Sequence, residues 1–286
     1  MPRSRGSSRT LTSLIRTTRI ALAVLIAMAP PAAAQSVAGV PVAAEPADPP
    51  VAKVPFGPGE RLGYKVKLGI FGTVGEGSME VVGVDTIHGH PTYHLRFDLE
   101  GKVLFAEVDD RLQSWLDVSR LVARRFEQDQ KEVNFKRHRI FDFFPEERRY
   151  VRRDREGEGE LATDEPLDDV SFLYFVRTLP LEVGKTYTFE RYYKADGNPV
   201  TLQVLRKETV TVPAGTFETI VVRPIIKTDG LFGEGGEAEV YFTDDEQRLL
   251  VMMKSKVPVI GNLSLHLDSY TPGEPLREAR ARKSGS

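Results

Sequence analysis

The chain has 286 residues, with 39 basic against 41 acidic side chains and a formal net charge of −2. It contains no cysteine, which excludes disulfides and the cysteine-linked lipid anchor of bacterial lipoproteins. The stability of any folded domain must therefore come from its core.

The first 34 residues have the three-part order of a cleavable secretion signal. Five arginines and no acid lead into an uninterrupted apolar run, Ile20–Met28, and two prolines and three alanines follow it. This run is about half the length that a membrane-spanning helix needs. We therefore expect a signal peptide over residues 1–34, cleaved near Ala34–Gln35, with a periplasmic product and no transmembrane span after cleavage.

Removal of that segment takes five arginines and no acid, which leaves 34 basic against 41 acidic residues and a net charge of −7. An acidic surplus argues against nucleic acid as a partner, because phosphate binding requires excess positive charge. Composition divides the remainder into an Ala/Pro-rich linker (35–55), a β domain (56–272) and a basic disordered tail (273–286).

Alternation of apolar and polar residues dominates the predicted domain and is typical of antiparallel strands with one face on a core. The clearest runs are 61–68, 93–100 and 257–268. Turn residues separate the runs at Gly89–Pro91, Gly197–Pro199, Pro213–Gly215 and Asp244–Asp245. The pattern predicts roughly ten to twelve strands.

Residues 168–179 lack alternation and are apolar on nearly every side. An acidic start and the following Pro180 favour a buried helix, capped by Thr163 or Asp164, over a buried strand. The predicted fold is mainly β: a curved antiparallel sheet or half-open barrel with one buried helix near residues 168–179.

Four stretches taken together resemble the DUF3108 family, exported bacterial proteins of undefined function. They are PFGPGERLGY (55–64), DVSFLYFVRTLP (169–180), VTVPAGTFET (210–219) and YFTDDEQRLL (241–250). The resemblance covers about residues 55–272 and implies an envelope-located β domain. It implies no activity, substrate or catalytic residue. A curved sheet with a helix in its mouth also looks like the lipoprotein-carrier folds of the periplasm, an architectural analogy that assigns no function.

No catalytic, cofactor or metal site is predicted. His88, His90 and His94 form the most metal-like cluster, but Gly89 and Pro91 indicate ordinary turn histidines. The segment 184–186 (GKT) lacks the preceding glycine and the following helix of a phosphate-binding loop. Serine-hydrolase and zinc-protease motifs are absent from the sequence.

Two groups of residues are candidates for binding. A hairpin over 131–153 around Pro145 would place six arginines on one basic surface suited to an anionic lipid head group, unless they form solvated charge that protects an edge. These are Arg137, Arg139, Arg148, Arg149, Arg152 and Arg153. On the helix, Phe172, Tyr174 and Phe175 either line a cavity for an acyl chain or fill a core.

These features favour a periplasmic, non-enzymatic domain that binds an apolar or lipid ligand in envelope maintenance. The alternatives are a protein–protein interaction scaffold in the envelope and, third, a hydrolase with an unfamiliar site.

Overall fold

The computed structural model describes residues 51–103, 106–132, 135–226, 238–257 and 261–276. The chain divides into two units, Met1–Ala47 and Asp48–Ser286, and all described residues belong to the second. The predicted signal peptide, nearly all of the predicted linker and most of the predicted tail lie outside the described residues.

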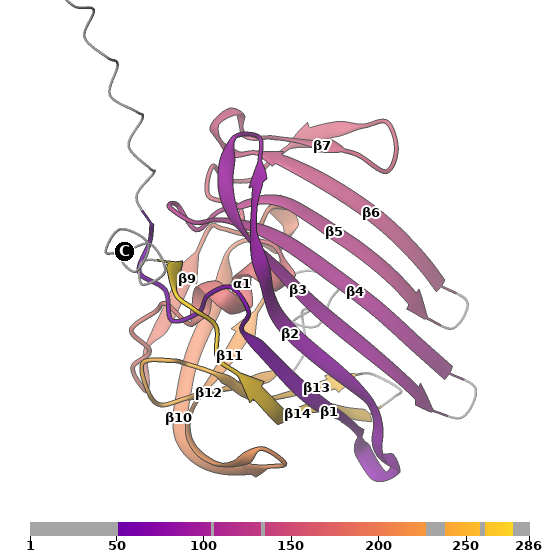
Figure 1. The fold of residues 1–286 in the computed structure, drawn as a ribbon, viewed down its shortest axis with the longest axis vertical. Coiled ribbons are helices and arrows are strands. Elements are labelled where there is room, and N and C mark those ends of the chain that lie inside the picture. Colours follow the sequence, from indigo (N-terminus) through magenta and orange to yellow (C-terminus); the bar gives the residue numbers. More distant parts are fainter. Residues whose placement is uncertain (1–50, 104–105, 133–134, 227–237, 258–260, 277–286) are drawn as a thin grey trace, which may run out of the picture. The chain divides into compact units, whose positions relative to one another are not determined.

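Within the described residues, fourteen strands form one antiparallel sheet (Figure 1). The strands are β1 (Arg61–Leu68), β2 (Gly72–Ile87), β3 (His90–Val103), β4 (Ala106–Asp117), β5 (Ala123–Glu132), β6 (Phe135–Phe144), β7 (Arg149–Arg152), β8 (Glu158–Glu160), β9 (Thr186–Phe189), β10 (Val200–Val212), β11 (Gly215–Ile225), β12 (Glu239–Thr243), β13 (Leu250–Val257) and β14 (Gly261–Thr271). Nearly every strand pairs with its neighbour in sequence, β1 also pairs with β14, and β8 and β9 are the two edges. The predicted mainly-β fold is confirmed.

The strand count exceeds the prediction because long alternating runs hide turns. The run at 257–268 belongs to two strands, since β13 ends at Val257 and β14 begins at Gly261. The predicted hairpin around Pro145 is present as β6 and β7, joined by the short 3-10 helix η2 (Pro145–Glu147). Two further 3-10 turns are η1 (Gly69–Phe71) and η3 (Ala195–Gly197).

The predicted helix is confirmed as α1 (Asp169–Val176), but the predicted cap is wrong. Asp168 caps it: one carboxylate oxygen accepts from the amides of Val170 and Ser171 at 3.0 Å, and the Ser171 hydroxyl accepts from the Asp168 amide at 2.9 Å. Thr163 and Asp164 cannot act as the N-cap, because α1 begins only at Asp169 and the residue directly before it is Asp168.

Six of the eight residues of α1 are buried. The helix packs on β3 and β4, and the face of the sheet that it contacts is called the inner face below. No helix in the described part of the chain combines the length and the apolar character that crossing a bilayer requires.

Strict alternation fixes which side chains reach the inner face. In β3, Tyr93, Leu95 and Phe97 are buried, while the polar residues between them point to the outer face. Because a one-residue shift would exchange the two faces, the register of each strand also decides which polar residues are carried inward.

A buried ion pair joins distant parts of the chain. Both side chains, Glu60 and Arg177, are 1% exposed. The Arg177 guanidinium donates to the two Glu60 carboxylate oxygens at 2.6 and 2.9 Å and to the backbone oxygen of Gln247 at 3.1 Å. Glu60, Arg177 and Gln247 lie in the stretches 55–64, 169–180 and 241–250, respectively. The ion pair therefore brings three separate sequence motifs together.

Gly57 lets the two ends of the domain cross beside this pair. A Cβ atom at Gly57 would lie 2.2 Å from the backbone oxygen of Glu274, so only glycine fits without a shift of the backbone. The Glu274 amide donates to the Pro58 oxygen at 3.0 Å, and the Glu60 amide donates to the Gly57 oxygen at 3.1 Å. The first motif thus positions Glu60 through its glycine.

Replacing Arg177 by methionine should lower the free energy of unfolding by about 3–5 kcal/mol, because it leaves the Glu60 carboxylate buried without its partner. Urea unfolding at pH 7 measures this loss. The double variant Glu60→Leu/Arg177→Met should lose less than the single one. If Arg177→Met costs no more than Arg61→Ala, which breaks the exposed pair with Glu80, the buried pair does not hold the motifs together.

Candidate functional site

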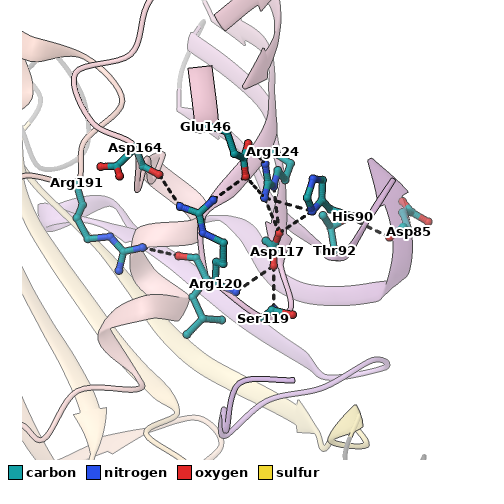
Figure 2. A network of polar contacts seen from close by, with 11 residues as sticks. Asp85, His90, Thr92, Asp117, Ser119, Arg120, Arg124, Glu146, Asp164 and Arg191 are labelled. Carbon is teal, nitrogen blue, oxygen red and sulfur yellow. Dashed lines mark hydrogen bonds and ion pairs between the residues drawn. The ribbon is translucent and has the colours of Figure 1, made fainter. Parts of the chain in front are cut away.

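A polar network surrounds Arg124 at the start of β5 (Figure 2). The Arg124 side chain is 2% exposed and donates to Asp117 at 3.0 and 3.1 Å and to Glu146 at 2.7 Å. Asp117 also accepts from the amides of Ser119 and Arg120, which closes the turn between β4 and β5. Hydrogen bonding by Arg124 lowers the pKa of Glu146 to about 2.

The outer arginines of this network bind the loops around it. Arg120 donates to Glu146 at 2.6 Å and to the Asp164 oxygen at 3.1 Å, and Arg191 donates to the Leu121 oxygen at 2.7 Å. Their guanidinium groups are thus directed at acceptors of the protein itself. The network therefore joins the loops around it.

Arg124→Ala should lower the free energy of unfolding by about 3–5 kcal/mol, because Asp117 would remain buried without its charge partner. Arg120→Ala is the matched control. It removes a partner of the same Glu146 from a half-exposed position and should cost about 0–1 kcal/mol. Equal losses in chemical denaturation would contradict the role assigned to Arg124.

The three candidate histidines face different carboxylates instead of one another. The pairs are His88–Asp142 at 3.3 Å, His90–Asp117 at 3.5 Å and His94–Asp85 at 3.4 Å. Burial is the largest effect on His88 and lowers its pKa. Among the described residues, no three His, Cys, Asp or Glu side chains gather as metal ligands would.

The six arginines of the predicted patch are separated in the structure. Arg153 lies 3.2 Å from Asp142 on the outer face, and Arg149 lies 2.9 Å from Glu147. Arg148 donates to the backbone oxygen of Ala162. Three of the six are therefore engaged away from the inner face.

The other three arginines share the inner face of β6 and β7. Arg137 and Arg139 alternate with the exposed Lys136 and His138. Arg152, opposite Phe141, lies over its ring at 4.7 Å and donates to Asp154 at 2.8 Å. The role of the six arginines in ligand binding stays a prediction.

Lys194 joins Arg137 and Arg139 from the segment before η3. The preceding Tyr193 packs its ring on the inner face, 5.6 Å from Phe141 and 6.0 Å from Phe126. The Lys194 ammonium lies 5.2 Å from the Tyr193 ring centre. Lys194 thus adds a third half-buried cation beside the aromatic part of the face that carries Arg137 and Arg139.

The electrostatics of this inner-face cluster, Arg137, Arg139 and Lys194, are unfavourable. Burial lowers the pKa of Arg139, and repulsion from Arg137 and Arg152 lowers it further. Burial also lowers the pKa of Lys194, against the attraction of Asp169. Within the described residues, no carboxylate forms an ion pair with Arg139 or Lys194.

Gln128 adds an unsatisfied acceptor to the cluster. It lies on β5 directly opposite Arg139. Its side-chain oxygen is buried and has no hydrogen-bond partner in the described structure. Sequence reasoning missed Gln128 and Lys194. A signal for Gln128 is present in the sequence. Phe126, Gln128 and Gln130 are spaced two residues apart, so in a strand the two glutamines lie on the same face as the apolar Phe126.

The aromatic residues predicted on the helix are packed among other side chains. Tyr174 is 0% exposed with its ring 4.9 Å from Phe56, and Phe172 is 3% exposed. Phe175 is half-buried against Phe189 at 5.4 Å. Contact of these residues with a ligand stays a prediction.

Asp168 is a buried carboxyl that ties α1 to the sheet. The Ser114 hydroxyl of β4 donates to it at 2.6 Å, in addition to the two helix amides. Burial raises its pKa to about 7, and these hydrogen bonds only partly oppose that effect. The native state therefore holds a proton on Asp168 between about pH 4 and 7 that the unfolded state releases.

It follows that the contribution of Asp168 to stability is greatest below about pH 4 and is lost as the pH rises through about 7. Asp168→Asn keeps an oxygen for the helix amides but does not titrate, so its unfolding free energy should fall less steeply over this window. Unfolding measured at several pH values tests this. The exposed Asp164→Asn should keep the wild-type slope, and an unchanged slope in Asp168→Asn would contradict the assignment.

Comparisons with known proteins concern family and fold. The model of a family described as "Protein of unknown function (DUF3108)" matches residues 63–268. No curated protein matches the sequence. A crystal structure of a β-barrel-like protein of domain DUF1849 from Brucella abortus is similar at 11% identity and a TM-score of 0.48, covering 76% of this chain and 98% of that one. A "putative lipoprotein" from Parabacteroides distasonis has the same identity and coverages and a TM-score of 0.33.

Proposed function

The chain belongs to the DUF3108 family, and we propose that it acts as a non-enzymatic binding domain in the periplasm, where it holds a lipid-like ligand on the inner face of its sheet. The role is in envelope maintenance. Export follows from the signal-like residues 1–34, with cleavage near Ala34–Gln35.

One observation carries this proposal: the inner-face cluster has positive charge without ion-pair partners for Arg139 and Lys194 next to aromatic rings. Half-buried charge is costly unless it is paired. An amphiphile with an acidic head offsets that cost through its charge, and its apolar part contacts the half-buried Tyr150, whose ring lies 5.6 Å from that of Phe141. The two chemistries required of a lipid-binding surface therefore lie side by side.

Because Tyr174 is buried, we place the proposed ligand away from the helix. A ligand beside α1 would have to displace packed side chains, at a cost comparable to that of core mutations. A ligand at the cluster instead contacts residues that are already half-exposed. The inner face of β5 and β6 is thus the preferred place.

Native mass spectrometry of the exported protein, purified gently from the periplasm, tests this function. We expect a population with an added mass of an amphiphile, identified by organic extraction, and uptake of lipid by the stripped protein. A clean apo mass together with no uptake of short-chain lipids would contradict the proposal.

An interaction scaffold in the envelope is a second candidate, favoured by the turn between β1 and β2. There Ile70 and Phe71 are 97% and 55% exposed. Large apolar side chains exposed together mark contact surfaces. A strictly apo protein in the mass measurement would favour this alternative.

A further inference from the structure

The register of β5 and β6 sets out a graded surface on the inner face. Phe126 lies opposite Phe141, Gln128 opposite Arg139, and Gln130 opposite Arg137. The first of these three cross-strand pairs is formed by two aromatic rings. In each of the other two, a side-chain amide lies opposite a guanidinium group.

Arg137 and Arg139 differ in how their donors are used. One nitrogen of Arg137 donates to Gln130 at 3.3 Å. Gln128 lies directly opposite Arg139 on the neighbouring strand, and its side-chain oxygen accepts no hydrogen bond from Arg139. A donor-rich group and an acceptor thus stand side by side without bonding, the arrangement expected where a ligand group contacts both.

Lys194 completes the cluster from a different element. Tyr193 is held between Phe126, Phe141 and Phe143, which fixes the backbone before Lys194. Burial is the largest effect on the pKa of Lys194 and lowers it, Asp169 and Asp196 raise it, and Arg139 and Arg137 lower it. Because Tyr193 packs on Phe141, which shares the inner face of β6 with Arg139, Lys194 extends beside the same surface.

The acids around the cluster are used elsewhere. Asp154 binds Arg152 at 2.8 Å, Asp168 accepts from Ser114, and Asp169 accepts from the Tyr192 hydroxyl at 3.1 Å. Burial raises the pKa of both Asp168 and Asp169, and Asp169 attracts Lys194 without forming an ion pair with it in the described structure. The remaining neighbours are the exposed Asp196 beside Lys194 and the exposed Arg155 beside Arg139.

The geometry of the donors selects among anions. A guanidinium binds a phosphate through two parallel hydrogen bonds, and an ammonium adds a point charge. A carboxylate has two acceptor oxygens, whereas a phosphate group has enough acceptor oxygens to bind Arg137, Arg139 and Lys194 together. The Gln128 oxygen requires a donor, which a hydroxyl next to the phosphate supplies.

We infer that Arg139 and Lys194, assisted by Arg137, bind the phosphate group of a ligand that also carries a hydroxyl, and that the Gln128 side chain accepts from this hydroxyl. Glycerol phosphates and sugar phosphates, free or as the head group of a lipid, have this chemistry. The inference rests on the inner-face location in the proposed function and adds the recognised group.

Calorimetric titration separates the sources of the phosphate. The probes are glycerol 3-phosphate, inorganic phosphate, dioctanoyl phosphatidylglycerol and its phosphate-free counterpart dioctanoylglycerol. We expect phosphatidylglycerol to bind at least about tenfold more tightly than dioctanoylglycerol, because a hydrogen bond to a charged group strengthens binding by about that factor or more. Glycerol 3-phosphate should bind more tightly than inorganic phosphate. The variant Gln128→Leu should bind the two with equal affinity.

Variants identify the site. Arg139→Gln and Lys194→Gln should each weaken phosphatidylglycerol binding at least about tenfold. Lys136→Gln removes the same charge from the exposed outer face of β6 and should have no effect. Because Arg139 forms no ion pair with any described residue, Arg139→Gln should unfold at a temperature no lower than wild type, which a structural role for Arg139 would not allow.

The possible failures are distinct. Equal binding of phosphatidylglycerol and dioctanoylglycerol, or full binding by Arg139→Gln, overturns the phosphate site and leaves lipid binding standing. Binding of glycerol 3-phosphate through Arg139, with no binding of either lipid, supports the phosphate site and contradicts the lipid function. Absence of binding by all four probes contradicts both.

Discussion

The ion pair between Glu60 and Arg177 is the contact on which the arrangement of this sheet depends. It is buried, it is bidentate, and a third acceptor comes from the backbone at Gln247. An isolated charge at either position would be strongly unfavourable, so the opening motif, the end of α1 and the turn before β13 have to meet. A fold with no disulfide thereby obtains a specific link between its first strand, its helix and its last strands.

Two classes of buried charge are found in this molecule, and their partners distinguish them. Arg177 and Arg124 are almost completely buried, and each has a carboxylate within 3.0 Å. Arg139 and Lys194 are half-buried and have none in the described structure. Charges of the first class hold loops and strands together. Those of the second class stay accessible to solvent at one face of the sheet, where Asp169 and Asp196 attract Lys194 without forming an ion pair with it in the described structure.

Alternation predicted the fold class, the apolar segment before Pro180 predicted the helix, and the resemblance of four short stretches indicated the family, because all three depend on patterns within short segments. The cap of α1 was misplaced because Asp168 and Ser171 act as a pair, and the helix start had been judged from single residues. The candidate site could be predicted only in part. Arg137 and Arg139 were recognised as basic, but their separation from Arg149 and Arg153 depends on strand register. Lys194 reaches the cluster through the packing of Tyr193, a contact between residues far apart in the sequence.

The inner face of β5 and β6 is expected to hold a phosphate-bearing ligand. A crystal structure of the exported protein, purified without stripping its lipids, tests this most directly. We expect a tetrahedral group within hydrogen-bond distance of Arg139 and Lys194, with a hydroxyl that donates to the Gln128 oxygen. A structure in which Arg139 and Lys194 pair with carboxylates of the protein, such as Asp196, and no ligand lies between them would contradict it.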